Sequence, residues 1–556
     1  MTAKTLYLFV LAALTCFLVA GCGEGQEKAA IASGKGQPNQ PVAQQKFEPA
    51  YGDMLIRGSI GDASVLLPVL AIDSASFDII SLIYNGLLKY DKNIKLVGDL
   101  ADKWEISEDK LKIRFHLRKD VKWQDGQPFT SKDVEFTYKL IIDPKTPTAY
   151  ASDFLKVKNF RVLDPYTFEV TYYKPYAPAL DSWGVSMLPE HLLKGQDVTK
   201  SPLKRHPVGT GPYRFVEWKT GQEIVVDSNH DYFEGRPYID RVLTRIIPDL
   251  ATMFLELKAG RIDEMDLTPL QDKRQTNTRW FKENFAKYKY LSFSYSYLGY
   301  NLKDWKFKDR KVRQALTTAI NRQSIVDGVL LGLGQVTDTP YKPDSFWYNQ
   351  NVKKFPYDPE KAKRMLAEAG WKDTNGDGIL EKDGKPFEFT ILINQGNELR
   401  KNAAVIIQSD LKKVGIKVNI RVIEWAALLN NFIYNRNFEA CLLGWTIGVD
   451  PNQIDIWNSK KIAPKELNFV TYQNPEVDRL LEEGASTYDR NERKKYYDRF
   501  QEIIAEDQPY TFLYVPDSLP IISSRFKGIK PAPNGIGYNF IKWYVPKQLQ
   551  KYHIQP

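Results

Sequence analysis

Histidines, cysteines and paired carboxylates are the side chains that most often carry catalysis, and this chain offers no set of them at an enzyme's spacing. Its histidines are scattered and none is paired as metal ligands would be: His116, His191, His206, His230 and His553. There is no Gly-x-Ser-x-Gly elbow and no phosphate-binding loop. The glycines in the run 332–334 follow an expected helix and lack the third glycine of a dinucleotide site. We predict a protein that is not an enzyme and holds no cofactor.

Residues 373–379 carry oxygen side chains at alternate positions and a glycine for a sharp turn, as the first half of a calcium-binding loop does. The bidentate glutamate of such a loop belongs five residues after Ile379, where this chain has Gly384. A glycine-rich hairpin turn between Trp371 and Phe387 explains the same residues. We favour the hairpin and assign no metal site.

One cysteine indicates a covalent modification. Residues 18–22 read Leu-Val-Ala-Gly-Cys and close an apolar run behind Lys4, which is typical of a cleaved secretory signal whose new N-terminal cysteine is acylated. A retained membrane anchor is the alternative, but the apolar run 6–20 is shorter than the roughly 20 residues that a bilayer span needs. We expect a signal peptide at 1–21, lipidation of Cys22 and a flexible tether over 22–50. The body is then exported and lipid-anchored on the extracytoplasmic face of the cell envelope.

The composition describes a large, well-packed body. The 556 residues exceed what one core organises, so two or three lobes are expected. The formal charge is +9, but basic residues alternate with acidic ones and form no stripe, so we predict no nucleic-acid partner. Cys441 is left alone in the mature body, which excludes an internal disulfide, and its apolar neighbours indicate a buried small hydrophobe.

Strands and helices alternate along the body without the regular rhythm of a doubly wound sheet. The run 110–118 alternates polar and apolar residues as a half-buried strand does. Thr130 and Asp133 match a capping box that opens a helix. Residues 403–413 and 491–505 have helical spacing, and 416–422 alternate again. The fold class is therefore mixed α/β.

Several motifs occur in order along the chain, and together they indicate a family. The segments that carry them are 100–109, 115–134, 207–215, 312–322, 357–371, 444–451 and 472–478. The series resembles the extracytoplasmic solute-binding proteins of family 5, which serve oligopeptide and dipeptide ABC importers. The resemblance runs from about residue 54 to about residue 526.

The resemblance implies a two-lobed periplasmic-binding-protein fold, type II-like, that closes by a hinge and carries an additional small domain. Lobe I would be discontinuous, the small domain and lobe II would each be one segment, and the hinge would lie near residues 292 and 517. The expected ranges are 51–83, 207–292 and 518–556 for lobe I, 84–206 for the small domain and 293–517 for lobe II.

The resemblance also implies where a ligand binds. Relatives of the dipeptide type hold the peptide's amino group with an aspartate three residues after a Gly-Trp motif. Here that position is Gly448, so Asp450 is the nearest acid and Trp445 matches the wall of the cleft. Further expected ligand residues, in a loop and helix that face the cleft, are Asn394, Gln395 and Arg400, the last as a clamp for a carboxylate. Alternatives stay open, with Asp450 starting a turn and Arg400 facing solvent.

The expected function is the substrate-binding subunit of an ABC importer. Short peptides would be captured between the lobes and passed to a membrane permease with its ATPase subunits, while the N-terminal lipid holds the protein, as a monomer, to the membrane. The alternative is the same scaffold with another solute, such as a metal chelate, a sugar oligomer or a cell-wall peptide. A third class, a lipoprotein enzyme or an adhesion protein, would need a catalytic set, repeats or an exposed apolar patch, none of which the sequence shows.

Overall fold

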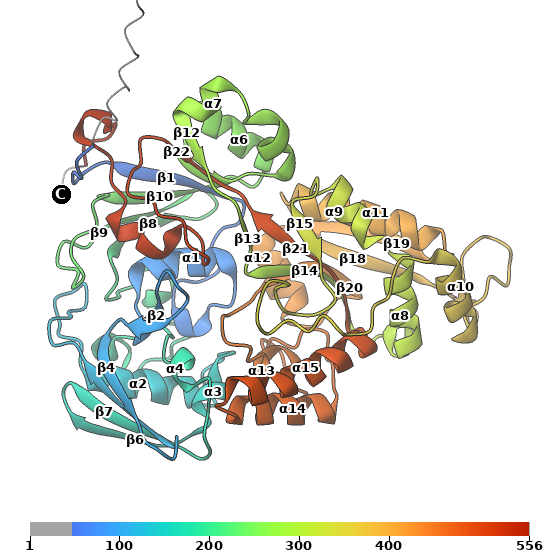
Figure 1. Ribbon diagram of the computed structural model, residues 1–556, viewed down its shortest axis with the longest axis horizontal. Coiled ribbons are helices and arrows are strands. Elements are labelled where there is room, and N and C mark those ends of the chain that lie inside the picture. The colour runs from blue at the N-terminus through green and yellow to red at the C-terminus, as the bar shows by residue number, and fades with distance from the viewer. Residues whose placement is uncertain (1–46, 555–556) are drawn as a thin grey trace, which may run out of the picture. The chain divides into compact units, whose positions relative to one another are not determined.

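Two seven-stranded sheets and a four-stranded sheet organise residues 47–554, the part of the chain that the computed structural model describes (Figure 1). The chain divides into the units Met1–Phe47 and Glu48–Pro556, and the described helices and strands belong to the second. The predicted signal peptide and Cys22 lie outside the described residues. Within residues 47–554 no helix has the length and apolar character needed to cross a membrane.

The first sheet gathers strands from distant parts of the sequence in the order β12-β22-β11-β1-β10-β9-β8. Strand β1 pairs in parallel with β10 and β11, and the other neighbours are antiparallel. Helices α1, α6 and α7 accompany it, and apolar residues of α6 and α7 form a core with its strands. The bounds are β1 Met54–Ser59, β8 Tyr213–Lys219, β9 Glu223–Ser228, β10 Arg241–Ile246, β11 Glu264–Asp266, β12 Phe285–Lys287, β22 Pro520–Ser523, α1 Ser74–Ile83, α6 Leu250–Lys258 and α7 Arg279–Asn284.

The second sheet has the order β13-β21-β14-β20-β18-β19, with β15 paired to β21. It is buried on two faces, because alternate residues of β20 enter different cores: Ala440 and Leu442 on one side, Cys441 and Leu443 on the other. Its helices are α8 to α11, α14 and α15. The bounds are β13 Tyr290–Leu291, β14 Ser294–Tyr300, β15 Gly334–Val336, β18 Glu388–Asn394, β19 Lys417–Ile423, β20 Ala440–Thr446, β21 Tyr510–Ser518, α8 Arg310–Ala319, α9 Arg322–Gly328, α10 Pro359–Glu368, α11 Glu398–Lys412, α14 Pro475–Ser486 and α15 Arg490–Asp507.

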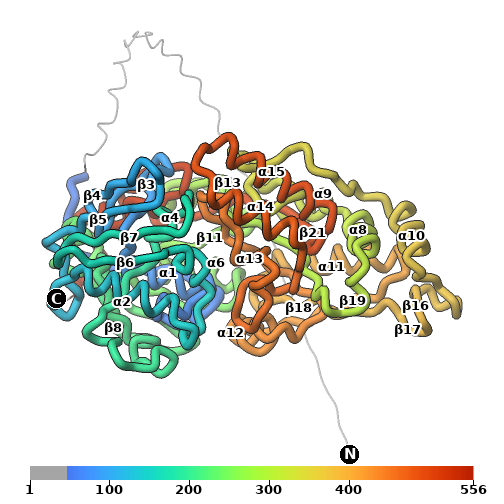
Figure 2. Tube along the Cα trace, turned by 90° about the horizontal axis from the view of Figure 1, so that it is seen from below, coloured from blue at the N-terminus to red at the C-terminus, as the bar shows by residue number. Residues whose placement is uncertain are grey.

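The small sheet is antiparallel, in the order β4-β5-β7-β6, and lies at the opposite end of the described chain from α10 (Figure 2). Phe115 of β5 stacks on Phe168 of β7, with ring centroids 5.0 Å apart, and both rings pack beside Trp183. The bounds are β4 Ala101–Ile106, β5 Lys112–Leu117, β6 Val157–Asp164, β7 Thr167–Tyr172, α2 Ser131–Ile142, α3 Ala151–Phe154, α4 Ala179–Ser182 and α5 Glu190–Leu193. A two-stranded ribbon, β2 Leu88–Tyr90 and β3 Leu96–Gly98, accompanies it.

The chain passes twice between the two large sheets. Strand β12 belongs to the first sheet and β13, three residues later, to the second. Strand β21 ends at Ser518 in the second sheet, and after Leu519 the chain enters β22 of the first. These two passages lie near each other, because β13 pairs with the last residues of β21.

The local sequence predictions agree well with these elements. The capping box is present, since Thr130 accepts from the backbone of α2 and Asp133 accepts from the Thr130 amide at 2.8 Å. Strand β5 buries alternate residues, as the run 110–118 predicts. Helix α11 begins five residues before the predicted start, because the side chain of Asn397 caps it. Cys441 is fully buried, and burial raises the pKa of its thiol to about 12.

Candidate functional site

A cavity of about 1040 Å³ opens where several parts of the chain meet. The first sheet and α1 line one side of it, and helices α3 and α4, beside the small sheet, line another. The turn after β20 reaches it with Gly448 and Val449, and the short helix α13, Ile454–Trp457, reaches it with Asp455. The cavity is therefore built by tertiary structure, from segments that are hundreds of residues apart in sequence.

Direct bonds join residues 152–177, beside the small sheet, to helices α13 and α14 next to this cavity. The Ser152 hydroxyl donates to Asp455 over 2.6 Å, and Lys156 pairs with Glu482 of α14. The Ala177 amide donates to the carbonyl of Ala485 at 2.8 Å. The hydrogen bond to Asp455 in the cavity wall, together with the ion pair and the backbone hydrogen bond to α14, makes this contact specific.

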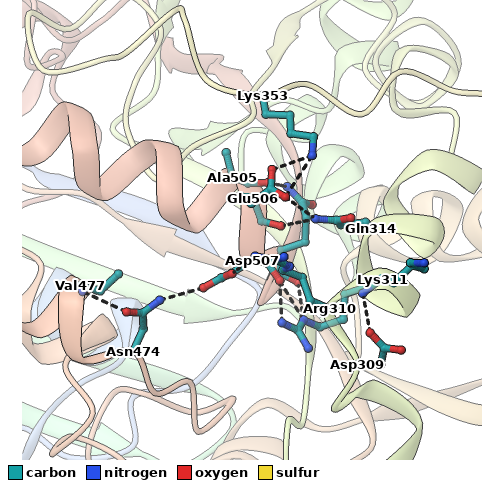
Figure 3. A network of polar contacts seen from close by, with 12 residues as sticks. Asp309, Arg310, Lys311, Gln314, Lys353, Asn474, Val477, Ala505, Glu506 and Asp507 are labelled. Carbon is teal, nitrogen blue, oxygen red and sulfur yellow. Dashed lines mark hydrogen bonds and ion pairs between the residues drawn. The ribbon is translucent and has the colours of Figure 1, made fainter. Parts of the chain in front are cut away.

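A network at the far end of α15 fixes the same helices (Figure 3). Asn474, the cap of α14, donates to Asp507 over 3.0 Å. Gln314 of α8 donates to the Glu506 carbonyl over 2.6 Å, and Lys353 pairs with the Glu506 carboxylate at 2.8 Å. These bonds link α8, which packs on one face of the second sheet, to α14 and α15, which pack on the other.

Three carboxylates of the first sheet and α1 face the cavity, and we name Asp78, Glu264 and Asp266 the β11 carboxylates. Burial raises the pKa of Glu264 to about 7; Arg57 opposes this shift, while Asp266, Asp78 and Asp263 add to it. The pKa values of Asp78 and Asp266 are also raised by desolvation, although their side chains remain open to water. Arg57 donates to the Asp78 carbonyl over 3.0 Å and is the basic group nearest to this set.

Two further carboxylates come from helices α3 and α4, and we name Asp153 and Asp181 the α3–α4 carboxylates. Asp153 accepts from Tyr176, from Ser182 over 2.7 Å and from Asn452. Asp181 accepts from the hydroxyl of Tyr90. Burial raises the pKa of both groups to about 6, and Asp455 contributes to the shift of Asp153. Hydrogen bonds therefore position these acids, while no cation neutralises them within the described chain.

The remaining acids of the cavity have cationic partners. Lys89 lies 3.2 Å from Asp99 and 2.6 Å from Glu234. Asp455 lies 3.3 Å from Lys461. Together, eight carboxylates and only two basic side chains, Arg57 and Lys89, line the cavity.

The sequence-predicted ligand residues lie in three places away from this lining. Asn394 and Arg400 meet at the end of β18, where the Arg400 guanidinium donates to the side-chain oxygen Oδ1 of Asn394 over 2.7 Å. Burial lowers the pKa of Arg400. Gln395 lines a second cavity of about 390 Å³, which also includes Pro248 and Trp425. Their roles toward a ligand stay predictions.

Asp450 and Trp445 are engaged within the protein. Both oxygens of Asp450 accept from Arg493 of α15, over 2.6 and 2.8 Å, and both side chains are almost fully buried. The Trp445 indole donates to the Tyr510 hydroxyl over 3.2 Å and stacks on Phe469, with centroids 5.1 Å apart. Gly448, the position that the family pattern gives to an aspartate, does line the large cavity.

The family is decided by a comparison with family models. Residues 95–464 match the model for bacterial extracellular solute-binding proteins, family 5. The chain belongs to this family. Membership confirms the predicted periplasmic-binding-protein fold, and it confirms that this exported protein binds a solute rather than catalysing a reaction.

Characterised relatives are similar over nearly the whole chain. The oligopeptide-binding protein AppA of Bacillus subtilis is 39% identical over 554 residues, which cover 97% of this chain and 98% of AppA. Heme-binding protein A of Haemophilus influenzae is 30% identical and covers 84% of this chain and 88% of its own length.

Solved structures of relatives carry different solutes. The AppA structure with a nonapeptide superposes with a TM-score of 0.85 at 38% identity, covering 90% of this chain and all of that one. NikZ of Campylobacter jejuni with Ni(L-His) gives 0.81 at 32% identity, covering 88% and 99%. DppA of Helicobacter pylori with the peptide STSA gives 0.81 at 29% identity, covering 90% and 99%.

Sequence reasoning missed the cavity carboxylates because no short motif contains them. One signal was available: Glu264 and Asp266 flank the buried Met265 in β11, and alternation in a strand places both carboxylates on the same face. Asp78, Asp153 and the other acids join them only through tertiary structure.

One acidic cluster outside the cavity has the geometry of a cation site. Oxygen atoms of Asp373, Asp377 and Glu381 lie within 4.8 Å of one another. Glu381 opens the ribbon β16 Glu381–Lys382 and β17 Lys385–Pro386, and it accepts from Thr374 at 2.8 Å. The predicted hairpin is therefore present. It also brings the Glu381 carboxylate close to Asp373 and Asp377, whereas the sequence comparison looked for a third acid only at position 384.

Proposed function

We propose that this protein captures oligopeptides in the large cavity and delivers them to an ABC permease with its ATPase subunits. The observation that carries the proposal is the cavity of about 1040 Å³ between the first sheet, the predicted small domain and the segment after β20. Its volume is at the upper end of the range for small-ligand pockets, which suits an extended ligand of several residues. The 39% identity with an oligopeptide-binding protein over almost the full chain supports the same conclusion.

In this proposal the α3–α4 carboxylates hold the peptide's amino terminus. They lie in the same cavity lining as Gly448, and Asp450 already has its charge satisfied by Arg493. A buried ammonium group needs an anionic partner, because an unpaired charge in a low-dielectric site is costly. The Asp181 carboxylate, which accepts only from Tyr90 among the described residues, keeps acceptor capacity for a ligand.

Capture requires the two halves to move. The predicted hinge near residues 292 and 517 lies within a few residues of the two passages between the large sheets, which supports rigid-body closure of the predicted lobes. The Gly396 loop after β18 approaches Pro248 after β10 so closely that a Cβ at Gly396 would lie 1.9 Å from the Pro248 carbonyl oxygen. Acylation of Cys22 and the tether over 22–50 would keep the binding unit, as a monomer, near the permease.

Native mass spectrometry of the full chain, purified in mild detergent without denaturation, tests the proposal. We expect a series of bound masses that fit short peptides. A single bound mass that fits haem, a metal chelate or a sugar oligomer would overturn the peptide assignment in favour of the same scaffold with another solute.

A second experiment tests the amino-terminal site. Asp181→Asn should weaken the binding of a peptide with a free amino terminus about tenfold, as measured by calorimetry, and leave its N-acetylated form unaffected. Asp197→Asn, at an exposed aspartate outside the cavity, is the matched control and should change neither affinity. Equal losses for the free and acetylated peptides would contradict this placement of the amino group.

A further inference from the structure

The charge of the cavity runs opposite to the charge of the protein. The chain carries a formal net charge of +9, yet eight carboxylates and two basic groups line the cavity. A lining with the average composition of the chain would have a net charge near zero or slightly positive. The acidic lining is therefore a local property of this site, and local charge at a binding cavity sets which ligands it attracts.

Five of these carboxylates have no cation beside them. Within residues 47–554, no basic nitrogen lies within 4.0 Å of the β11 carboxylates or the α3–α4 carboxylates, whereas Asp99, Glu234 and Asp455 are all paired. Acids that are partly withdrawn from water and close to one another repel, and the raised pKa of Glu264 reflects both effects. A positively charged ligand group would relieve this repulsion.

The geometry favours an organic cation over a metal ion. Among the described residues, the only group of three acids, histidines or cysteines whose ligand atoms lie within 4.8 Å of one another is the one at 373–381, outside the cavity. The β11 carboxylates are thus spread too widely to share one metal ion. A lysine ammonium or an arginine guanidinium can instead be approached by acids from several sides.

The surroundings suit the rest of such a side chain. Tyr290 and Phe540 line the cavity together with the β11 carboxylates, and they offer aromatic surface to an aliphatic stem or a cation.

We propose that the cavity selects basic peptides, with the β11 carboxylates receiving a lysine or arginine side chain of the ligand. This inference rests on the proposed peptide-binding function and adds a second cationic position to the one for the amino terminus. The α3–α4 carboxylates recognise a group that every free peptide has, so they give affinity without selectivity. The β11 carboxylates recognise a side chain, so they decide which peptides the protein prefers.

Calorimetry with the full chain at pH 8 tests the inference. The ligands are pentapeptides in which one position at a time holds lysine, its neutral analogue norleucine, or glutamate. At one or more positions, lysine should bind at least tenfold more tightly than norleucine, and glutamate should bind more weakly than norleucine. If lysine and norleucine differ by less than twofold at every position, the inference is overturned while peptide binding stands. If no pentapeptide binds, the proposed function itself fails.

Variants locate the selectivity. Glu264→Gln should reduce the advantage of lysine over norleucine about tenfold, because it removes a charge that only the lysine peptide engages. Asp266→Asn, at an exposed position, should act in the same direction and guards against misfolding of the first variant. Glu217→Gln, on an exposed site of the same sheet outside the cavity, is the matched control. An unchanged lysine preference in both cavity variants would place the selectivity elsewhere and refute the role of the β11 carboxylates.

Discussion

Replacing Asp450 by asparagine separates two roles that the sequence leaves open for this residue. As a ligand group it would bind the amino terminus of a peptide, whereas in the structure both of its oxygens accept from Arg493. The exposed fractions of the two side chains are 14% for Asp450 and 7% for Arg493, so the pair is largely shielded from water. Arg493 also donates to the Gly484 carbonyl over 2.9 Å, which ties the pair to α14.

The size of the effect follows from the charge that the substitution leaves behind. Removing one partner of a buried ion pair costs about 3–5 kcal/mol, because the other charge remains buried without compensation. Asparagine keeps one oxygen for Arg493, so we expect the lower end, about 3 kcal/mol of unfolding free energy. Changing both residues, Asp450→Leu with Arg493→Met, removes both charges and should return the stability to within about 1 kcal/mol of the wild type.

The assay is urea unfolding of the full chain, followed by tryptophan fluorescence, together with the affinity for a peptide at 20 °C. Asp450→Asn should lower the urea midpoint and leave the affinity of the folded protein within twofold. Asp498→Asn removes the partner of Lys494 on the same helix, where both side chains are more exposed, and should cost less than about 1 kcal/mol. An unchanged midpoint with an affinity loss of more than tenfold would refute this reasoning and make Asp450 a ligand group.

Two further predictions concern pH and closure. The pKa of Glu264 is raised from an ordinary 4.5 to about 7, and the pKa values of the α3–α4 carboxylates are raised to about 6. Between about pH 4 and 7 the folded protein therefore binds more protons than the unfolded chain. The stability of the free protein should accordingly fall as the pH rises from about 4 to 7. Affinity for lysine peptides should change in the opposite sense and weaken below pH 7, as calorimetry from pH 5.5 to 8 can check; a pH-independent affinity would contradict the role of these acids. In Gly396→Ala the new Cβ would lie 1.9 Å from the Pro248 carbonyl oxygen, so closure should be hindered and peptide affinity should fall at least tenfold. Gly376→Ala has a similar positive φ but open space around it, so it should lose only about 1 kcal/mol of stability and no affinity; equal affinities in the two variants would exclude this contact from closure.

The sequence by itself determined the local elements and the family. The capping box at Thr130 and the alternation in β5 depend on neighbours within a few residues, so their signals are complete in a short window. The glycines at 209 and 211 belong to a motif that the sequence shows, and the structure gives their reason: a Cβ at Gly209 would lie 1.9 Å from the Ile83 carbonyl oxygen. The ordered series of motifs was specific enough to predict the fold and a binding function.

Only the tertiary structure decided which charges meet. Asp450 and Arg493 are 43 residues apart, and neither segment contains a motif that predicts an ion pair between them. The β11 carboxylates and the α3–α4 carboxylates come from separate helices and strands, and their raised pKa values arise from burial and mutual repulsion after folding. Charge and residue type are local properties of a sequence, but desolvation and pairing are properties of the space around a side chain, and this space exists only once distant segments have packed together.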